Sequence, residues 1–188
     1  MRAGQALSLF LRHRPQTVLD IGCGDGEHTR AMRAVGIKVQ TVSMREPADY
    51  IGDYERLNLG RFQGIWASHV LEHALNVQAF LEKAFGDLTD DGVIAVTVPP
   101  YKPEIVGGHV SLWNAGLLLY RMILAGFDCS EAQVGCYDYN VSVVVKRKKA
   151  ELPKLNRDSG DIARLARFFP FPVRDGFDGR VENVRWYE

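Results

Sequence analysis

The stretch Val18-Leu19-Asp20-Ile21-Gly22-Cys23-Gly24-Asp25-Gly26 decides the fold of this chain. It begins inside a compact apolar run at residues 17–21, typical of a buried strand, and ends in a turn with a glycine at every second position. Residues 27–35 then carry apolar side chains at helical spacing, and residues 37–42 form a second β-rich run. This order of elements predicts a right-handed unit of parallel strands.

The glycine-rich turn has the composition of a ligand-binding loop. Glycine lets the backbone turn sharply and lets a ligand approach the main chain, while amides at the start of the next helix can face a polar ligand. The spacing Gly-x-Gly-x-Gly is one residue shorter than the dinucleotide pattern, and Asp20 precedes it. A carboxylate there favours a ligand with an ammonium group. A purely structural turn is the alternative.

Strands and helices continue to alternate along the chain. We expect further strands at 50–53, 62–68, 93–98, 129–137 and 140–146, helices at 2–13, 70–88 and 112–125, and a turn at 89–92. The last two strands are close enough to form a hairpin, which makes the last strand antiparallel. The pattern predicts an α/β domain with a mostly parallel sheet, whose ligands bind at the carboxyl ends of the strands.

Composition excludes several classes of protein. The 188 residues are 46% hydrophobic and 24% charged, with zero net charge, which allows one domain with a short extension. Zero net charge makes nucleic acid an unlikely main partner. No apolar run is long enough for a membrane span, and the first residues do not resemble a secretory signal. Three cysteines make no disulfide framework, so a reducing, cytoplasmic compartment is expected.

Four motifs in order make residues 17–146 resemble the class I S-adenosylmethionine-dependent methyltransferases. They are the glycine-rich stretch, Ala67-Ser68-His69-Val70-Leu71-Glu72-His73 with its Leu-Glu-His ending, the turn and strand at 88–99, and Ala125-Gly126-Phe127. The resemblance implies a Rossmann-like α/β fold: a mostly parallel seven-stranded sheet, trimmed in places, with an antiparallel last strand and helices on both faces. It also implies methyl transfer from S-adenosylmethionine.

The resemblance further implies a cofactor site. Asp20, Gly22 and Gly24 would hold the methionine half of the cofactor, with Asp20 reaching its ammonium group. Asp53 would contact the adenine amino group beside Tyr54, and Ser68 and His69 would border the sulfonium. The complete expected set is Asp20, Gly22, Cys23, Gly24, Ser43, Met44, Asp53, Tyr54, Ser68 and His69.

One position departs from the family pattern. Ser43 stands after the second strand, where an acid usually holds the ribose hydroxyls, and a neutral hydrogen bond is weaker than a charge-assisted one. Glu46 in the next loop is a possible substitute. Residues 44–50 are too few for the helix that usually follows, so we expect a loop there.

Two histidines are candidates for catalysis. Methyl transfer is an in-line displacement for which a general base, most often histidine, can be needed. His69 and His109 fall at the binding edge of the expected sheet, so both are interpreted as catalytic. A second interpretation notes that His69, Glu72, His73 and His109 resemble the ligand pattern of metal-using methyltransferases that act on small RNA or ubiquinone precursors. Purely structural roles are the third, and no metal is assigned.

The chain divides into a methyltransferase domain at residues 1–150 and an aromatic-rich extension at residues 151–188. The aromatic side chains of the extension should be buried, by packing on the domain, as a lid or in a homodimer contact. The basic run at 146–149 is either a solvated strand end or a site for an acidic acceptor.

These observations predict an enzyme that methylates a small-molecule or carbohydrate-like acceptor at oxygen. Two alternatives stay open: a cofactor-binding regulatory module without turnover, and a metal-assisted methyltransferase acting on RNA. A nicotinamide-dependent oxidoreductase is disfavoured by the glycine spacing and by the missing acid after the second strand.

Overall fold

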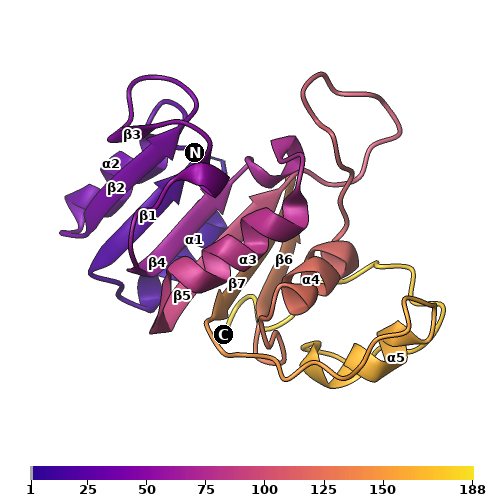
Figure 1. The fold of residues 1–188 in the computed structure, drawn as a ribbon. Coiled ribbons are helices and arrows are strands. Elements are labelled where there is room, and N and C mark those ends of the chain that lie inside the picture. Colours follow the sequence, from indigo (N-terminus) through magenta and orange to yellow (C-terminus); the bar gives the residue numbers. More distant parts are fainter. Residues whose placement is uncertain (1) are drawn as a thin grey trace.

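The computed structural model describes residues 2–188 as one sheet between two layers of helices (Figure 1). Within these residues the sheet has seven strands, in the order β3-β2-β1-β4-β5-β7-β6. Strands β1 to β5 run parallel, and β7 is antiparallel to both of its neighbours. This confirms the predicted Rossmann-like α/β class. The strands are β1 (Thr17–Ile21), β2 (Lys38–Ser43), β3 (Tyr50–Ile51), β4 (Phe62–Ser68), β5 (Leu88–Val98), β6 (Gln133–Tyr137) and β7 (Asn140–Lys146).

Helices cover both faces of the sheet, as expected. One face carries α1 and α2, whose Phe10 and Met32 belong to the same buried cluster as Trp66 of β4. The opposite face carries α3 and α4 (Figure 1). The α-helices are α1 (Gly4–Arg12), α2 (Glu27–Ala34), α3 (Val77–Asp87), α4 (Ala115–Leu124) and α5 (Asp161–Leu165), and the 3-10 turns are η1 (Tyr54–Arg56), η2 (Leu71–His73) and η3 (Ala166–Phe168).

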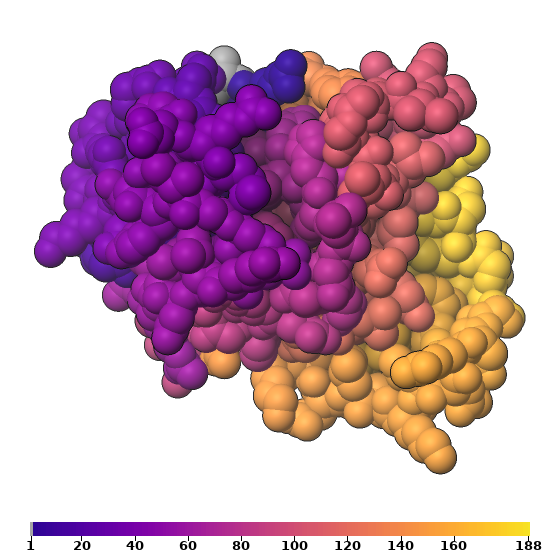
Figure 2. Space-filling view, turned by 45° about the horizontal axis from the view of Figure 1, so that its top comes forward, coloured from indigo at the N-terminus to yellow at the C-terminus, as the bar shows by residue number. Residues whose placement is uncertain are grey.

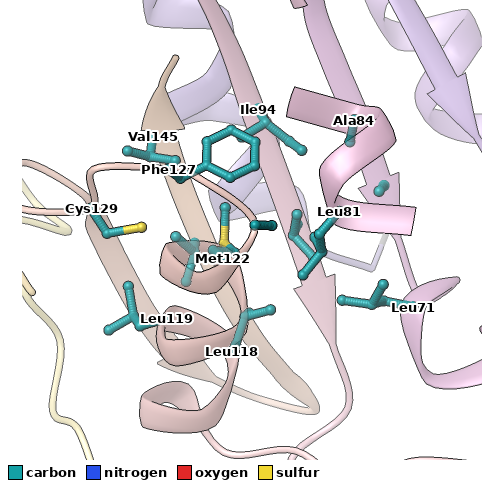
Figure 3. Packing of buried hydrophobic residues seen from close by; sticks show 14 of the residues in the cluster. Leu71, Leu81, Ala84, Ile94, Leu118, Leu119, Met122, Phe127, Cys129 and Val145 are labelled. Carbon is teal, nitrogen blue, oxygen red and sulfur yellow. The ribbon is translucent and has the colours of Figure 1, made fainter. Parts of the chain in front are cut away.

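The larger core lies between the sheet and the helices α3 and α4. Alternation along each strand sends Leu19, Ile65 and Ile94 to this face, while Val18, Trp66 and Val93 point to the other. Figure 3 shows side chains of α3 and α4 meeting those of β5 and β7 around Phe127. A fully buried core on both faces fixes the carboxyl ends of the strands at one rigid edge.

The predicted helix at 70–88 is wrong in its first part. The chain instead makes the short turn η2, runs extended at Ala74, and begins α3 at Val77. The Asn76 side chain accepts a hydrogen bond of 3.1 Å from Ala79 N and so caps α3. Leu71 and Phe80 pack in the same core, so the spacing of apolar residues along this stretch of sequence resembles that of one continuous helix.

Other boundaries differ less. The predicted turn at 89–92 is a bulge inside β5, where the register with β4 jumps between the pairs Phe62–Leu88 and Gly64–Val93. Residues 44–49 contain no helix, as expected from their length. The remaining predicted helix ends and strand ends shift by a few residues, most of all at the start of the sixth strand, which begins at Gln133.

The extension beyond residue 150 runs along the domain and returns to its first helix. Phe168 and Phe169 are buried in the larger core, and Val184 pairs with Val134 at the edge of the sheet. Trp186 is 3% exposed, packs against the cluster of α1, and donates a hydrogen bond of 2.9 Å from Nε1 to Gln5 Oε1. Near the other end of α1, Arg12 donates to the main-chain oxygen of Glu188.

Candidate active site

The glycine-rich turn bends the chain sharply between β1 and α2. Gly22, Gly24 and Gly26 have φ values of 71°, 56° and 77°, in the left-handed region that favours glycine. A Cβ at Gly22 would lie 2.9 Å from Val70 Cγ2, so this position has no room for a side chain. Space is open beside Gly24. The main chain of the turn can therefore be approached by a ligand.

Asp20 is a buried carboxylate just before this turn, with an exposure of 2%. Its Oδ2 accepts a hydrogen bond of 2.5 Å from Thr29 Oγ1. Burial raises the pKa of Asp20 from 3.8 to about 6, while the Thr29 hydrogen bond and the nearby His28 and Arg33 oppose the rise. A carboxylate in such surroundings is stabilised when a cationic group comes close.

A pocket of about 600 Å³ opens beside the turn, at the carboxyl ends of the parallel strands. One wall comes from the ends of β1 and β2 and from η1, and the other from the segment between Val70 and Phe80. Figure 2 shows the surface hollowed between the purple segment that contains β2 and β3 and the magenta and salmon segments opposite. This is the edge at which α/β sheets bind their ligands.

Five of the ten predicted cofactor-binding residues line this pocket, and five do not. The lining residues are Gly22, Ser43, Met44, Asp53 and Tyr54; the others are Asp20, Cys23, Gly24, Ser68 and His69. Cys23 lines a separate hollow of about 300 Å³ together with Thr29, on the side of α2. The buried hydroxyl of Ser68 has no hydrogen-bond partner.

Tyr54 forms a fixed aromatic wall of the pocket. Its hydroxyl donates a hydrogen bond of 2.9 Å to Asp87 Oδ2, and its ring meets that of Phe80 edge-on at 5.1 Å. Burial, followed by the negative charge of Asp87, raises the pKa of Tyr54, so the hydroxyl stays protonated. The ring, and not the hydroxyl, therefore faces a ligand.

Asp53 stands at the rim of the pocket and caps η1. Its Oδ1 accepts a hydrogen bond of 3.1 Å from Glu55 N, and its Oδ2 lies 3.4 Å from Arg56 Nε. The side chain is 45% exposed. A carboxylate has about four acceptor positions, so Asp53 can accept a further hydrogen bond from a ligand.

No acid follows β2 directly, at the position where the resemblance predicts contacts to the ribose hydroxyls. Ser43 ends β2 at the pocket, where its Oγ accepts a hydrogen bond of 3.2 Å from Arg45 N. Met44 next to it is 70% exposed, and Glu46 does not line the pocket. The hydroxyl of Ser43 is thus the polar side-chain group at the end of β2.

Both ring nitrogens of His69 are engaged. His69 has a φ of 55°, and its Nδ1 lies 3.3 Å from Glu72 Oε1 while its Nε2 lies 3.0 Å from Asn140 Oδ1. Burial opposes protonation of the ring, but the hydrogen bonds to Glu72 and Asn140 outweigh it and raise the pKa of His69. Since both partners are acceptors, the arrangement favours the imidazolium form.

A second group of side chains lies next to His69. Glu72, His73 and His109 each bring one potential ligand atom to within 4.8 Å of the others, and the rings of His73 and His109 meet edge-on at 5.0 Å. His73 also lines the large pocket. The structure thus brings His109, predicted from the loop after β5, next to Glu72 and His73 of η2, although His109 itself does not line the pocket.

Several pocket residues were missed from the sequence. Val70, Leu75 and Asn76 line the pocket because the chain is not helical there, and a continuous helix would have hidden them. Asn76 was a sequence signal for the true start of α3, because asparagine often caps the N-terminus of a helix. Arg56 at the rim had no such signal.

Comparison with known proteins places the chain in a family. The model of the methyltransferase domain family matches residues 2–132, so the chain belongs to that family. No curated protein matches its sequence.

Solved structures share the fold. One is Burkholderia thailandensis 1,6-didemethyltoxoflavin-N1-methyltransferase with bound 1,6-didemethyltoxoflavin and S-adenosylhomocysteine, at 17% identity, a TM-score of 0.67 and 78% coverage of each chain. The mitomycin 7-O-methyltransferase MmcR has 15% identity and a TM-score of 0.62, covering 77% of this chain and 53% of that one. The N-terminal domain of EvdMO1 in the presence of S-adenosylhomocysteine and D-fucose has 19% identity and a TM-score of 0.58, covering 77% and 83%.

Family and fold together make this protein a class I S-adenosylmethionine-dependent methyltransferase, as the motifs predicted. The family match ends just before β6, so the final hairpin and the extension lie outside it. Across residues 2–188, every helix is too short or too polar to span a bilayer.

Proposed function

We propose that this enzyme transfers the methyl group of S-adenosylmethionine to an oxygen of a small, carbohydrate-like acceptor. The observation that carries the proposal is the pocket of about 600 Å³ beside the glycine turn, in a chain of the methyltransferase domain family. Its volume falls in the range of about 300–1,000 Å³ that is usual for small-molecule sites. At Gly22 the missing side chain lets Val70 pack against the turn, and at Gly24 the space beside the main chain is open.

Different residues of the chain bind different parts of S-adenosylmethionine. The turn at Gly22 and Gly24 offers main-chain groups to the methionine end, and Asp20 balances the ammonium charge from beneath the turn. Asp53 accepts a hydrogen bond from the adenine amino group, and the ring of Tyr54 packs beside the base. The bound cofactor supplies the methyl group as a sulfonium, and the protein supplies its position.

The acceptor would enter from the side of the loop between β5 and α4. Both ring nitrogens of His69 are held by oxygen acceptors, so His69 orients its neighbours and is not free to take a proton. His109 is only partly buried and lies beside His73, which lines the pocket, so we place it near the acceptor. Fold neighbours that methylate oxygen, or that were solved in the presence of D-fucose, support a small hydroxylated acceptor.

Titration calorimetry with S-adenosylmethionine tests the binding part of this proposal. The variant Gly22→Val should lose binding, because the added side chain meets Val70. Gly60→Ala is the matched control: it also has a positive φ, with open space around it, but it does not line the pocket. Equal affinity in wild type and Gly22→Val would refute this site.

Transfer of a labelled methyl group tests the reaction. Sugars, nucleotide-sugars and total RNA are offered separately, and label in the sugar fractions is the expected result. Tight binding without transfer to any component of a cell extract would instead identify a regulatory module. Label confined to RNA would refute the acceptor class.

A further inference from the structure

Folding assembles one group of metal-type ligands from distant parts of the chain. Glu72 and His73 belong to η2, whereas His109 lies in the loop between β5 and α4. A hydrogen bond of 2.8 Å from Val110 N to Glu72 O ties this loop to η2. As a result, the three potential ligand atoms all lie within 4.8 Å of one another.

Glu72 has an unsatisfied oxygen in this group. The residue is 1% exposed, and its Oε1 faces His69 Nδ1 at 3.3 Å. Its Oε2 is buried and has no hydrogen-bond partner. A buried polar atom without a partner is costly and is rare in proteins, so this oxygen indicates an additional group that would satisfy it.

The ring of His73 is oriented as metal-binding histidines are. Its Nδ1 lies 2.7 Å from the main-chain oxygen of Gly108. A carbonyl oxygen only accepts, so Nδ1 carries the proton and Nε2 keeps its lone pair. Histidine ligands typically donate their second ring N–H to a carbonyl or carboxylate in this way. His69 fixes the Glu72 carboxylate in a comparable manner from the other side.

We infer that Glu72 Oε2, His73 Nε2 and a ring nitrogen of His109 bind a divalent transition metal ion of the zinc type. Two imidazole nitrogens and one carboxylate oxygen suit such ions better than calcium or magnesium, which prefer oxygen alone. Three protein ligands leave at least one coordination position open.

Binding would require a modest contraction of the group. Ligand atoms about 2.1 Å from a tetrahedral zinc ion lie roughly 3.4 Å apart, less than the 4.8 Å that bounds the present spacing. His109 can close this gap, because it follows two glycines in a loop and is only partly buried. Glu72 and His73 would stay in place.

The position of this site gives the ion a role that rests on the proposed function. His73 is both a ligand and a wall residue of the large pocket, so the open coordination position lies beside the bound cofactor. A hydroxylated acceptor would place its oxygen on the ion and release its acidified hydroxyl proton to solvent water. In-line attack of this oxygen on the sulfonium methyl group would form the C–O bond as the C–S bond breaks, and S-adenosylhomocysteine would leave.

Zinc titration of the chain, freed of metal by a chelator, tests the site without any methylation assay. We expect one zinc ion per chain, and at least tenfold weaker binding in both Glu72→Gln and His109→Ala. Co²⁺ in place of zinc should give visible absorption bands in the wild type but not in Glu72→Gln or His109→Ala. His13→Ala is the matched control, since His13 lies in a different hollow, and should bind as the wild type does.

The possible results of the zinc titration and of the methylation assay test separate claims. No zinc binding by the wild type, or undiminished binding in His109→Ala, would overturn the inference. Circular dichroism verifies folding, and His109→Ala decides alone if Glu72→Gln does not fold. S-adenosylmethionine should bind His109→Ala normally. Failure of cofactor binding or methyl transfer in the wild type would refute the proposed function while leaving the zinc result unaffected.

Discussion

The buried carboxylate of Asp20 makes a quantitative prediction about stability. An acid whose pKa is higher in the folded than in the unfolded state destabilises the fold once the pH exceeds the unfolded value, and fully so above the folded value. The step from 3.8 to about 6 corresponds to about 3 kcal/mol at high pH. Asp20→Asn removes this penalty, so the free energy of unfolding should rise relative to wild type as the pH increases.

The measured quantity is the difference in free energy of unfolding between Asp20→Asn and wild type, compared at two pH values. Relative to wild type, Asp20→Asn should gain about 3 kcal/mol at pH 8 but only ~0.5 kcal/mol at pH 4, a change of about 2.5 kcal/mol. Any fixed cost of burying the asparagine NH₂ group cancels in this comparison. Urea denaturation at both pH values measures it, with the exposed Asp91→Asn as control. A difference that stays constant between pH 4 and pH 8 would refute the reasoning.

The same residue should couple cofactor binding to pH. With a pKa of about 6, Asp20 is ionised in about one molecule in eleven at pH 5 and in about ten of eleven at pH 7. If only the ionised form pairs with the ammonium group, affinity for S-adenosylmethionine should be about tenfold lower at pH 5. Asp20→Asn should show weak binding without this dependence.

Three further substitutions test other parts of the structure. Gly22→Ala should lower the free energy of unfolding by about 1–3 kcal/mol, because φ is positive and the new methyl group meets Val70; unchanged urea denaturation would contradict this. Trp186→Ala should cost about 3–5 kcal/mol and lower the melting temperature, since the ring is buried against α1; the exposed Tyr187→Ala is its control. His69→Gln should be more destabilising at pH 6 than at pH 9, because wild-type His69 contributes stability below pH 6.5 that is lost as the pH rises through its raised pKa; equal losses in urea at both pH values would disprove this.

Local signals in the sequence predicted most of the sheet. Alternating or continuous apolar runs marked the strands, and the glycine turn marked where the ligand edge lies. Helix periodicity failed after β4, where Leu71 and Phe80 reach the same core from two separate elements. Hydrophobic periodicity indicates which residues are buried in the core. It does not indicate whether the backbone between two buried residues forms one continuous helix.

The details of the site depend on contacts that no local pattern encodes. His69 was predicted as a base, yet its Nε2 meets Asn140, 71 residues further along the chain. Tyr54 lines the large pocket, but the orientation of its hydroxyl is set by Asp87 on α3. Such pairings arise from tertiary packing, so no local pattern in the sequence predicts the protonation of His69 or the orientation of Tyr54.

The contacts between Trp186 and Gln5, and between Glu188 and Arg12, have a consequence for biosynthesis. Residues 186–188 are synthesised long after the first helix, so part of the apolar side of that helix stays uncovered until they are made. Nascent chains that lack these residues should therefore bind chaperones through the first helix.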